Sequence, residues 1–89
     1  MQFDWDDDKA LSNAEKHGVV FDVVRSFEIV TAVVVEDDRK DYGELRLVAL
    51  GLIGPRVHVL VYTERGRKVR VISLRKANRK EIEAYVESL

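Results

Sequence analysis

The spacing of apolar residues changes near residue 28, and this change limits the folds that the chain can adopt. Up to that point apolar residues recur every three or four positions, as on one side of a helix. Beyond it, β-branched residues dominate, which is typical of strands. With 89 residues the chain is large enough for one domain and too small for two. We therefore expect residues 1–89 to form a single domain in which helices pack on a sheet.

Two helices are predicted in the N-terminal part of the chain. The first covers Asp6–His17, where Asp6 can cap the N-terminus and Gly18 can end the helix in a left-handed conformation. The second is shorter and covers Phe21–Phe27, where apolar side chains are spaced by three.

Four strands and a last helix are predicted after these. The strands are Ile29–Glu36, Glu44–Leu52, Arg56–Thr63 and Lys68–Leu74. A polar loop, Asp37–Gly43, separates the first two, and Glu64–Arg67 forms a hairpin turn. Asn78 can cap a helix over Arg79–Leu89. Because short connections join the strands, the expected fold is α+β: two N-terminal helices, a four-stranded antiparallel sheet and a C-terminal helix, with the helices covering one face of the sheet.

Charge is distributed unevenly although the net charge is only -1. Acidic residues concentrate in the first half of the chain, whereas residues 65–80 contain no acid and eight bases. These bases are Arg65, Arg67, Lys68, Arg70, Arg75, Lys76, Arg79 and Lys80. Such asymmetry suggests a polyanionic partner, although a solvated hairpin and helix start explain it equally well. Strand alternation predicts that Arg70 and Arg75 lie on opposite faces of the sheet.

Several kinds of chemistry find no support in the sequence. It has no cysteine, no glycine-rich phosphate loop, no pair of histidines at ligand spacing and no serine in a nucleophile-elbow context. We therefore expect no metal and no cofactor. The N-terminus is acidic, unlike a secretory signal, and the apolar runs are too short to span a bilayer. We expect a cytoplasmic protein without a membrane partner.

Two short polar motifs could carry a reaction. Lys16 and His17 end the first helix, where His17 could act as a general acid or both could bind phosphate. A plain C-terminal cap with cations is the alternative. Glu64 stands beside Arg65, as a base would stand beside a phosphate-binding group, although an ion pair across the hairpin explains this equally.

Three groups of residues are specific when taken together in this order. The first is Phe3-x-Trp5-Asp6-x-x-Lys9 followed by Asn13-x-x-Lys16-His17-Gly18-Val19-x-Phe21, and the second is Glu44-x-Arg46-x-x-Ala49-x-Gly51. The third is Tyr62-Thr63-Glu64-Arg65, then Val69-Arg70-Val71-Ile72-Ser73-x-Arg75-Lys76-Ala77, and finally Glu81 to Tyr85. Over nearly the whole chain this resembles the BrnT toxin family. Leu74 departs from the family pattern, which has a small residue there.

The resemblance implies a toxin of a bacterial type II toxin–antitoxin pair with a RelE-like fold. Such a toxin cleaves RNA and arrests translation. Its partner would be a BrnA-like antitoxin with a ribbon-helix-helix fold, in a 2:2 heterotetramer that binds operator DNA only through the antitoxin. A gyrase-inhibiting toxin on the same superfold, or a non-catalytic RNA-binding module, are the alternatives.

A metal-independent RNA cleavage needs an acid, a base and cations for the developing charge. Residue type and motif match assign Arg65, Arg70 and Arg75 to the phosphate, His17 to the acid and Glu64 to the base. Further RNA contacts are expected from Lys9, Lys16, Lys76 and Arg67.

Overall fold

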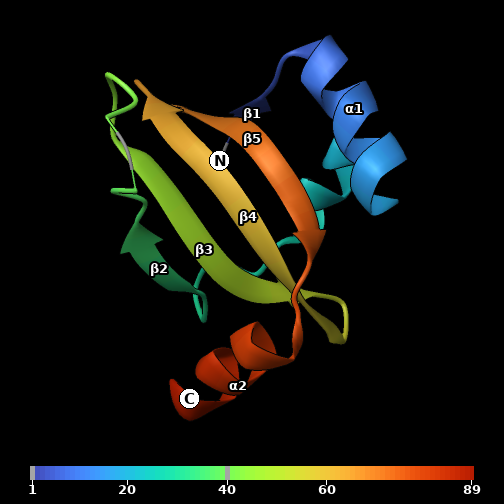
Figure 1. Ribbon diagram of the computed structural model, residues 1–89, viewed down its shortest axis with the longest axis vertical. Coiled ribbons are helices and arrows are strands. Elements are labelled where there is room, and N and C mark those ends of the chain that lie inside the picture. The colour runs from blue at the N-terminus through green and yellow to red at the C-terminus, as the bar shows by residue number, and fades with distance from the viewer. Residues whose placement is uncertain (1, 40) are drawn as a thin grey trace.

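One five-stranded sheet organises the molecule (Figure 1). The computed structural model describes residues 2–39 and 41–89. In chain order the elements are β1 (Gln2–Asp4), α1 (Asp7–His17), η1 (Phe21–Ser26), β2 (Val33–Glu36), β3 (Arg46–Ile53), β4 (Arg56–Arg65), β5 (Lys68–Lys76) and α2 (Arg79–Glu87). The strand order is β1-β5-β4-β3-β2, with β1 parallel to β5 and every other pair antiparallel.

The expected two N-terminal helices and four-stranded antiparallel sheet are wrong. The sheet has a fifth strand, Gln2–Asp4, whose parallel pairing with β5 makes the sheet mixed. Three residues are too few for a visible alternation, so the pattern gave no sign of it. The second helix is a six-residue 3₁₀-helix, Phe21–Ser26, and not an α-helix. What remains of the expectation is the combination of helices and an antiparallel meander, β2 to β5.

The first helix follows the sequence prediction closely. The Asp6 carboxylate accepts hydrogen bonds from the backbone N–H groups of Asp8 and Lys9, at 2.8 and 3.4 Å. Gly18 ends the helix with a φ of 69°, a conformation that glycine adopts without strain. β2, by contrast, begins four residues later than predicted, because a turn occupies the residues before Val33. Lys40, in the predicted loop after β2, lies outside the described residues.

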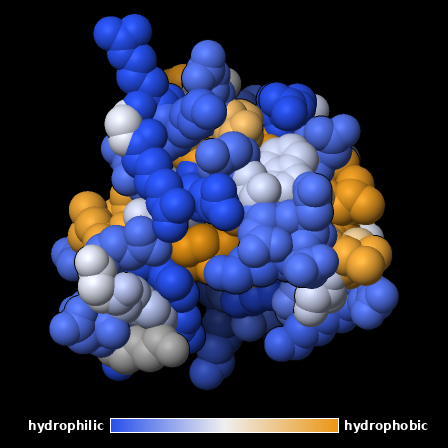
Figure 2. Space-filling model, turned by 90° about the horizontal axis from the view of Figure 1, so that it is seen from above, coloured by the Kyte–Doolittle hydropathy of each residue, from blue (hydrophilic) through white to orange (hydrophobic). Residues whose placement is uncertain are grey.

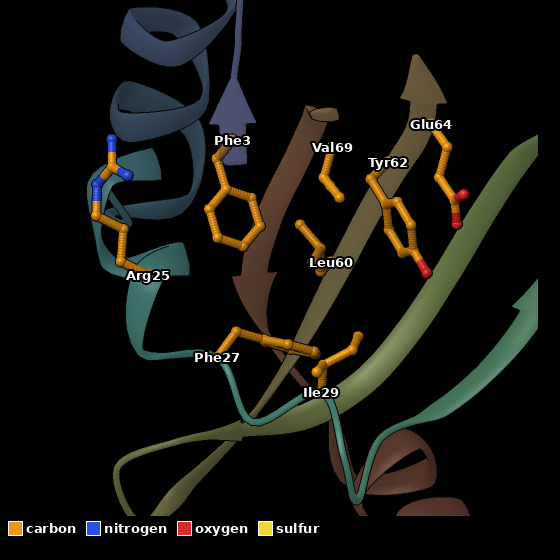
Figure 3. A pocket seen from close by; sticks show the side chains of 8 residues that line it. All are labelled: Phe3, Arg25, Phe27, Ile29, Leu60, Tyr62, Glu64 and Val69. Atoms are coloured by element: carbon orange, nitrogen blue, oxygen red, sulfur yellow. The ribbon is translucent and has the colours of Figure 1, made fainter. Parts of the chain in front are cut away.

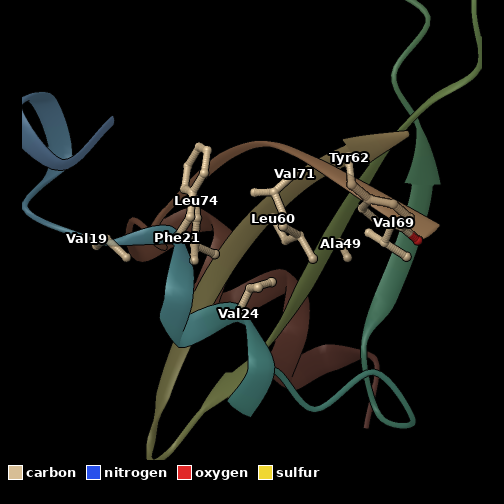
Figure 4. Packing of buried hydrophobic residues seen from close by; sticks show 9 residues of the cluster. All are labelled: Val19, Phe21, Val24, Ala49, Leu60, Tyr62, Val69, Val71 and Leu74. Carbon is tan, nitrogen blue, oxygen red and sulfur yellow. The ribbon is translucent and has the colours of Figure 1, made fainter. Parts of the chain in front are cut away.

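The hydrophobic core lies between η1 and one face of the sheet, which we call the core face (Figure 4). Its buried members are Val19, Phe21, Val24, Ala49, Leu60, Tyr62, Val69, Val71 and Leu74. Leu74, the departure from the family pattern, is fully buried there. At the end of this layer the ring of Phe27 lies only 2.6 Å from the position that a Cβ on Gly51 would occupy. Only glycine therefore fits this position of β3 without a shift of the ring.

α1 is fixed to the outer edge of β5 by one side chain. The buried amide of Asn13 donates to the backbone carbonyls of Leu74 at 2.7 Å and Val19 at 3.0 Å. Its oxygen accepts from the backbone N–H of Leu74 at 3.2 Å. β1 pairs with β5 only as far as Arg70, so Asn13 supplies at Leu74 the partner that a neighbouring strand would otherwise supply.

The C-terminal helix does not lie with η1 on the core face. It extends from the end of β5, at the opposite end of the sheet from the β4–β5 hairpin (Figure 1). Asn78 and Glu81 form a capping box at its start, and Tyr85 is buried. The expectation that all helices cover one face is thus also wrong. No helix in the described part of the chain is long and apolar enough to cross a membrane.

Replacing Asn13 by alanine should lower the free energy of unfolding by about 3 kcal/mol, because it leaves three buried backbone groups without partners. Urea denaturation followed by circular dichroism measures this. Ser12→Ala, at the exposed neighbour of Asn13 in the same helix, should change stability by less than about 0.5 kcal/mol. Equal stability of the two variants would show that Asn13 does not hold α1 to the sheet.

Candidate functional site

β5 contains one residue more than the stretch of β4 with which it pairs. Ser73 pairs with Val61, but Val71 pairs with the next residue of β4, Tyr62. The ladder therefore skips Ile72, which is the extra residue of a β-bulge. A shift of one residue reverses which face every later side chain occupies.

This bulge puts Arg70, Ser73 and Arg75 on the same face of the sheet. Ser73 and Arg75 pair with Val61 and Val59, and Arg70 pairs with Thr63; the three partners alternate along β4 and so share a face. The predicted separation of Arg70 from Arg75 is therefore wrong, because it assumed an unbroken alternation.

We call this side of the sheet the arginine face. It carries Arg70 and Arg75 of β5, Arg65 of β4 and Arg46 of β3, and it lies opposite the core face. Figure 1 looks onto it, with η1 behind the sheet. Figure 2 views the molecule from the end with the β4–β5 hairpin, where hydrophilic side chains cover most of the surface.

A shallow groove of about 240 Å³ runs between α1 and β5 next to the arginine face. Its lining residues are Lys9, Ser12, Asn13, Lys16 and His17 from α1, and Ile72 and Ser73 from the bulge. The spacing of the α1 residues places them on one side of the helix. The groove thus brings Lys9, Lys16 and His17, three of the predicted site residues, beside Ser73 on β5.

Each of the three arginines assigned to phosphate binding already has a carboxylate partner. Arg75 forms two short hydrogen bonds to Glu81, at 2.7 and 2.8 Å. Nη1 of Arg70 lies 3.6 Å from Oδ2 of Asp4, and Nη2 of Arg65 lies 3.6 Å from Oε2 of Glu44. The last two distances exceed a normal hydrogen bond, so these pairs are loose.

The ion pair between Arg75 and Glu81 also shifts the pKa of both side chains. Hydrogen bonds from Arg75 lower the pKa of Glu81, and the capping N–H of Asn78 adds to this. The carboxylate in turn raises the pKa of Arg75, although burial of the guanidinium and the charge of Arg39 oppose this. Arg75 therefore fixes the start of α2 as well as facing the site.

Glu64 is separated from the arginines that it was expected to assist. It alternates along β4 with Tyr62 and Leu60, so it lies on the core face. There it lines a 380 Å³ pocket with Phe3 and Val69 (Figure 3). Burial raises the pKa of the Tyr62 hydroxyl, and the nearby Glu64 charge adds to this.

Two further predicted RNA contacts also lie away from the groove. Lys76 pairs with His58 near the end of β5 and shares the core-face side of the strand with Leu74. Arg67 lies exposed in the β4–β5 turn. The structure does not bring either of them to α1.

Sequence reasoning missed two cations near the site, Arg46 and Arg39. Arg46 belongs to the second motif, and the pairing of β3 with β4 would have placed it beside Thr63. Arg39 forms hydrogen bonds of 2.8 and 2.9 Å to the buried carboxylate of Asp37. These bonds lower the pKa of Asp37 to about 2. Because Arg39 lies in an irregular loop, no periodic pattern in the sequence indicated that its side chain lies near the site.

The acidic and imidazole side chains of the described residues are scattered. Within 2–39 and 41–89, no group of three or more His, Asp or Glu side chains lies close enough together to hold a metal ion. The groove offers ammonium, imidazole, amide and hydroxyl groups, and the arginine face offers guanidinium groups together with the carboxylates that pair with them.

Comparison with known protein families gives a match over most of the chain. A protein-family model described as "Ribonuclease toxin, BrnT, of type II toxin-antitoxin system" matches residues 5–81. The matched span includes the whole groove and the four arginines of the arginine face. No curated protein matches the chain.

The lowered pKa of Glu81 predicts a pH-dependent contribution to stability. An acid with a lowered pKa in the folded state stabilises the fold fully above its unfolded pKa, about 4.3, and loses this contribution as the pH falls through the folded value. Wild type should therefore be more stable than Glu81→Gln at pH 7, and the difference should shrink below about pH 4. Thermal unfolding at several pH values measures this. Glu83→Gln, on the same helix, is the control, and an equal pH profile for both variants would contradict the assignment.

Proposed function

Because the chain belongs to the BrnT family of ribonuclease toxins of type II toxin–antitoxin systems, we propose that it cleaves RNA without a metal ion, at the α1 groove and the arginine face. The resemblance to this family is confirmed by the match over residues 5–81. The family gives the chain an RNA target and an antitoxin partner. The site, the mechanism and the identity of the antitoxin are our proposal.

The observation that carries the proposal is the bulge at Ile72. It supports one continuous cationic site, because it leaves Arg70 and Ser73 on one face, next to the groove that contains Lys16 and His17. Guanidinium and ammonium groups bind phosphodiesters through charge-assisted hydrogen bonds. An RNA strand lying along β5 would meet both sets of cations.

The proposed reaction is an attack of the 2′-hydroxyl on the adjacent phosphate. The 2′-oxygen loses its proton to solvent water and forms a bond to phosphorus, the bond to the 5′-oxygen breaks, and a 2′,3′-cyclic phosphate remains. His17, in its charged form, gives its proton to the leaving 5′-oxygen. Arg70 and Arg65, which lie near the β4–β5 hairpin, would stabilise the negative charge that develops on the phosphate. They are available for this because each lies 3.6 Å from its carboxylate partner, farther than a normal hydrogen bond.

The other predicted roles are adjusted to the geometry. Arg75 would orient the site while it anchors α2, because two hydrogen bonds to Glu81 occupy its guanidinium. Lys9 and Lys16 would bind flanking phosphates from the groove. Lys76, Arg67 and Glu64 lie outside this arrangement, so we propose no step for them.

For the partner, we propose a BrnA-like antitoxin with a ribbon-helix-helix fold. The toxin would act in the cytoplasm and form a 2:2 heterotetramer with this antitoxin, and the complex would bind operator DNA only through the antitoxin. Family membership supports this proposal. Co-purification followed by a mass measurement in solution tests the stoichiometry, and a 1:1 complex would contradict it.

Induced expression of the wild type should arrest growth, and the purified protein should cleave RNA equally well in EDTA. His17→Gln should slow cleavage by about 10²- to 10⁴-fold, the usual contribution of a general acid. Arg70→Gln should also lose most of the activity, whereas Arg56→Gln, at the far end of β4, should keep it. Circular dichroism controls for folding.

Three outcomes would contradict the proposal. Full activity of both His17→Gln and Arg70→Gln would show that cleavage does not take place at the proposed site. Loss of cleavage in EDTA would remove the metal-free mechanism. Inhibition of gyrase supercoiling, or RNA binding without any cleavage, would replace the proposed function by one of the two alternatives.

A further inference from the structure

Four side chains form a row across the arginine face near the β4–β5 hairpin. Asp4 pairs with Arg70, Arg70 with Thr63, and Thr63 with Arg46. Directly paired residues of neighbouring strands point to the same side, so the row runs straight across β1, β5, β4 and β3. Arg46 and Arg70 are two strand spacings apart, about 10 Å between their backbones.

The residue between the two arginines is small and fully buried. Thr63 is 2% exposed, and its hydroxyl donates to the carbonyl oxygen of Leu45 at 2.7 Å. Its own polar group is therefore satisfied. Arg46 and Arg70 thus flank a buried, neutral residue in this row.

Arg46 differs from the other arginines of this face in its surroundings. Its guanidinium carbon lies 3.7 Å above the centre of the Tyr42 ring, close enough for a cation–π contact. Its Nε is buried and has no hydrogen-bond partner. Among the described residues no carboxylate forms an ion pair with Arg46, whereas Arg65, Arg70 and Arg75 each have one.

An arginine stacked in this way favours the binding of an anion. The Tyr42 ring limits the orientations of the guanidinium, so less side-chain entropy is lost when a ligand binds. A buried, unpartnered N–H is costly to the free protein, and a strong acceptor would relieve that cost. On the other side of Thr63, Arg70 adds a second donor set whose acid partner, Asp4, lies 3.6 Å away.

We infer that Arg46 and Arg70 form a subsite for a phosphodiester of a single-stranded RNA substrate, with Tyr42 holding Arg46 in place. This inference rests on the proposed function and adds β3 to the site. The subsite would bind a phosphate next to the one that reacts, and so would extend the binding surface from the α1 groove across the sheet. Arg46 would act in substrate binding and not in proton transfer.

The test measures the affinity for a 2′-deoxy oligonucleotide of mixed sequence, which lacks the attacking hydroxyl and cannot be cleaved. Arg46→Gln should weaken binding by about 10- to 100-fold, the effect of one charge-assisted hydrogen bond. It should also reduce the slope of log affinity against log salt by about 0.7, the change expected when the protein neutralises one phosphate fewer on a single strand. Arg46→Lys should keep the slope.

Arg56→Gln removes the same charge from an exposed position at the opposite end of the sheet, and it should leave both quantities unchanged. Because Arg46 also packs on Tyr42, thermal unfolding of each variant accompanies the titration. If Arg46→Gln is less stable, binding is measured at a temperature where all variants are fully folded.

The outcomes separate the inference from the proposed function. If the wild type cleaves RNA and Arg46→Gln binds with unchanged affinity and salt slope, the subsite is wrong while the ribonuclease proposal stands. If the wild type neither binds nor cleaves RNA, both fail. A weaker affinity with an unchanged slope would also overturn the subsite, because it would mean that Arg46 acts only through the loop that carries Tyr42.

Discussion

The side-chain amide of Asn13 connects helix α1 to the edge of the sheet at β5. It takes the place of a strand at Leu74, where β1 has already turned away from the edge of β5. The extra residue Ile72 lies between the end of the pairing with β1 and this contact. The edge of β5 is thus held on both sides of the bulge. The same contact sets α1 against the bulge and so creates the groove that contains Lys16 and His17.

The distribution of charge in the sequence has a structural explanation. The acidic first half of the chain supplies Asp4 and Glu44, which face Arg70 and Arg65 from the basic segment. Both pairs are only partly exposed, and their closest N–O distances of 3.6 Å make them weaker than a hydrogen-bonded ion pair. Arg75 and Glu81 form a bidentate pair instead, and their main effect is on the position of α2. The uniform basic run therefore divides into cations available to a ligand and a cation that supports the fold.

Much of this arrangement could be predicted from local sequence patterns. The Asp6 cap, the Gly18 stop and the Asn78 cap depend on neighbouring residues alone, and each lies where it was expected. The features that were missed depend on distant partners. β1 is a strand only because β5 offers an edge, and the bulge exists only in the register of β5 against β4. For this reason the sequence placed Arg70 and Arg75 on opposite faces, grouped Glu64 with arginines that lie on the other face of the sheet, and did not draw attention to Arg46 as a candidate.

The central claim is that RNA lies across the arginine face and the α1 groove. It is tested most directly by titrating the isotope-labelled protein with a non-cleavable 2′-deoxy oligonucleotide and mapping the backbone amide shifts by NMR. The largest changes should fall on α1 from Lys9 to His17, on β5 from Arg70 to Arg75, and on Arg46. Changes concentrated instead on α2, or around the core-face pocket of Phe3 and Glu64, would contradict it.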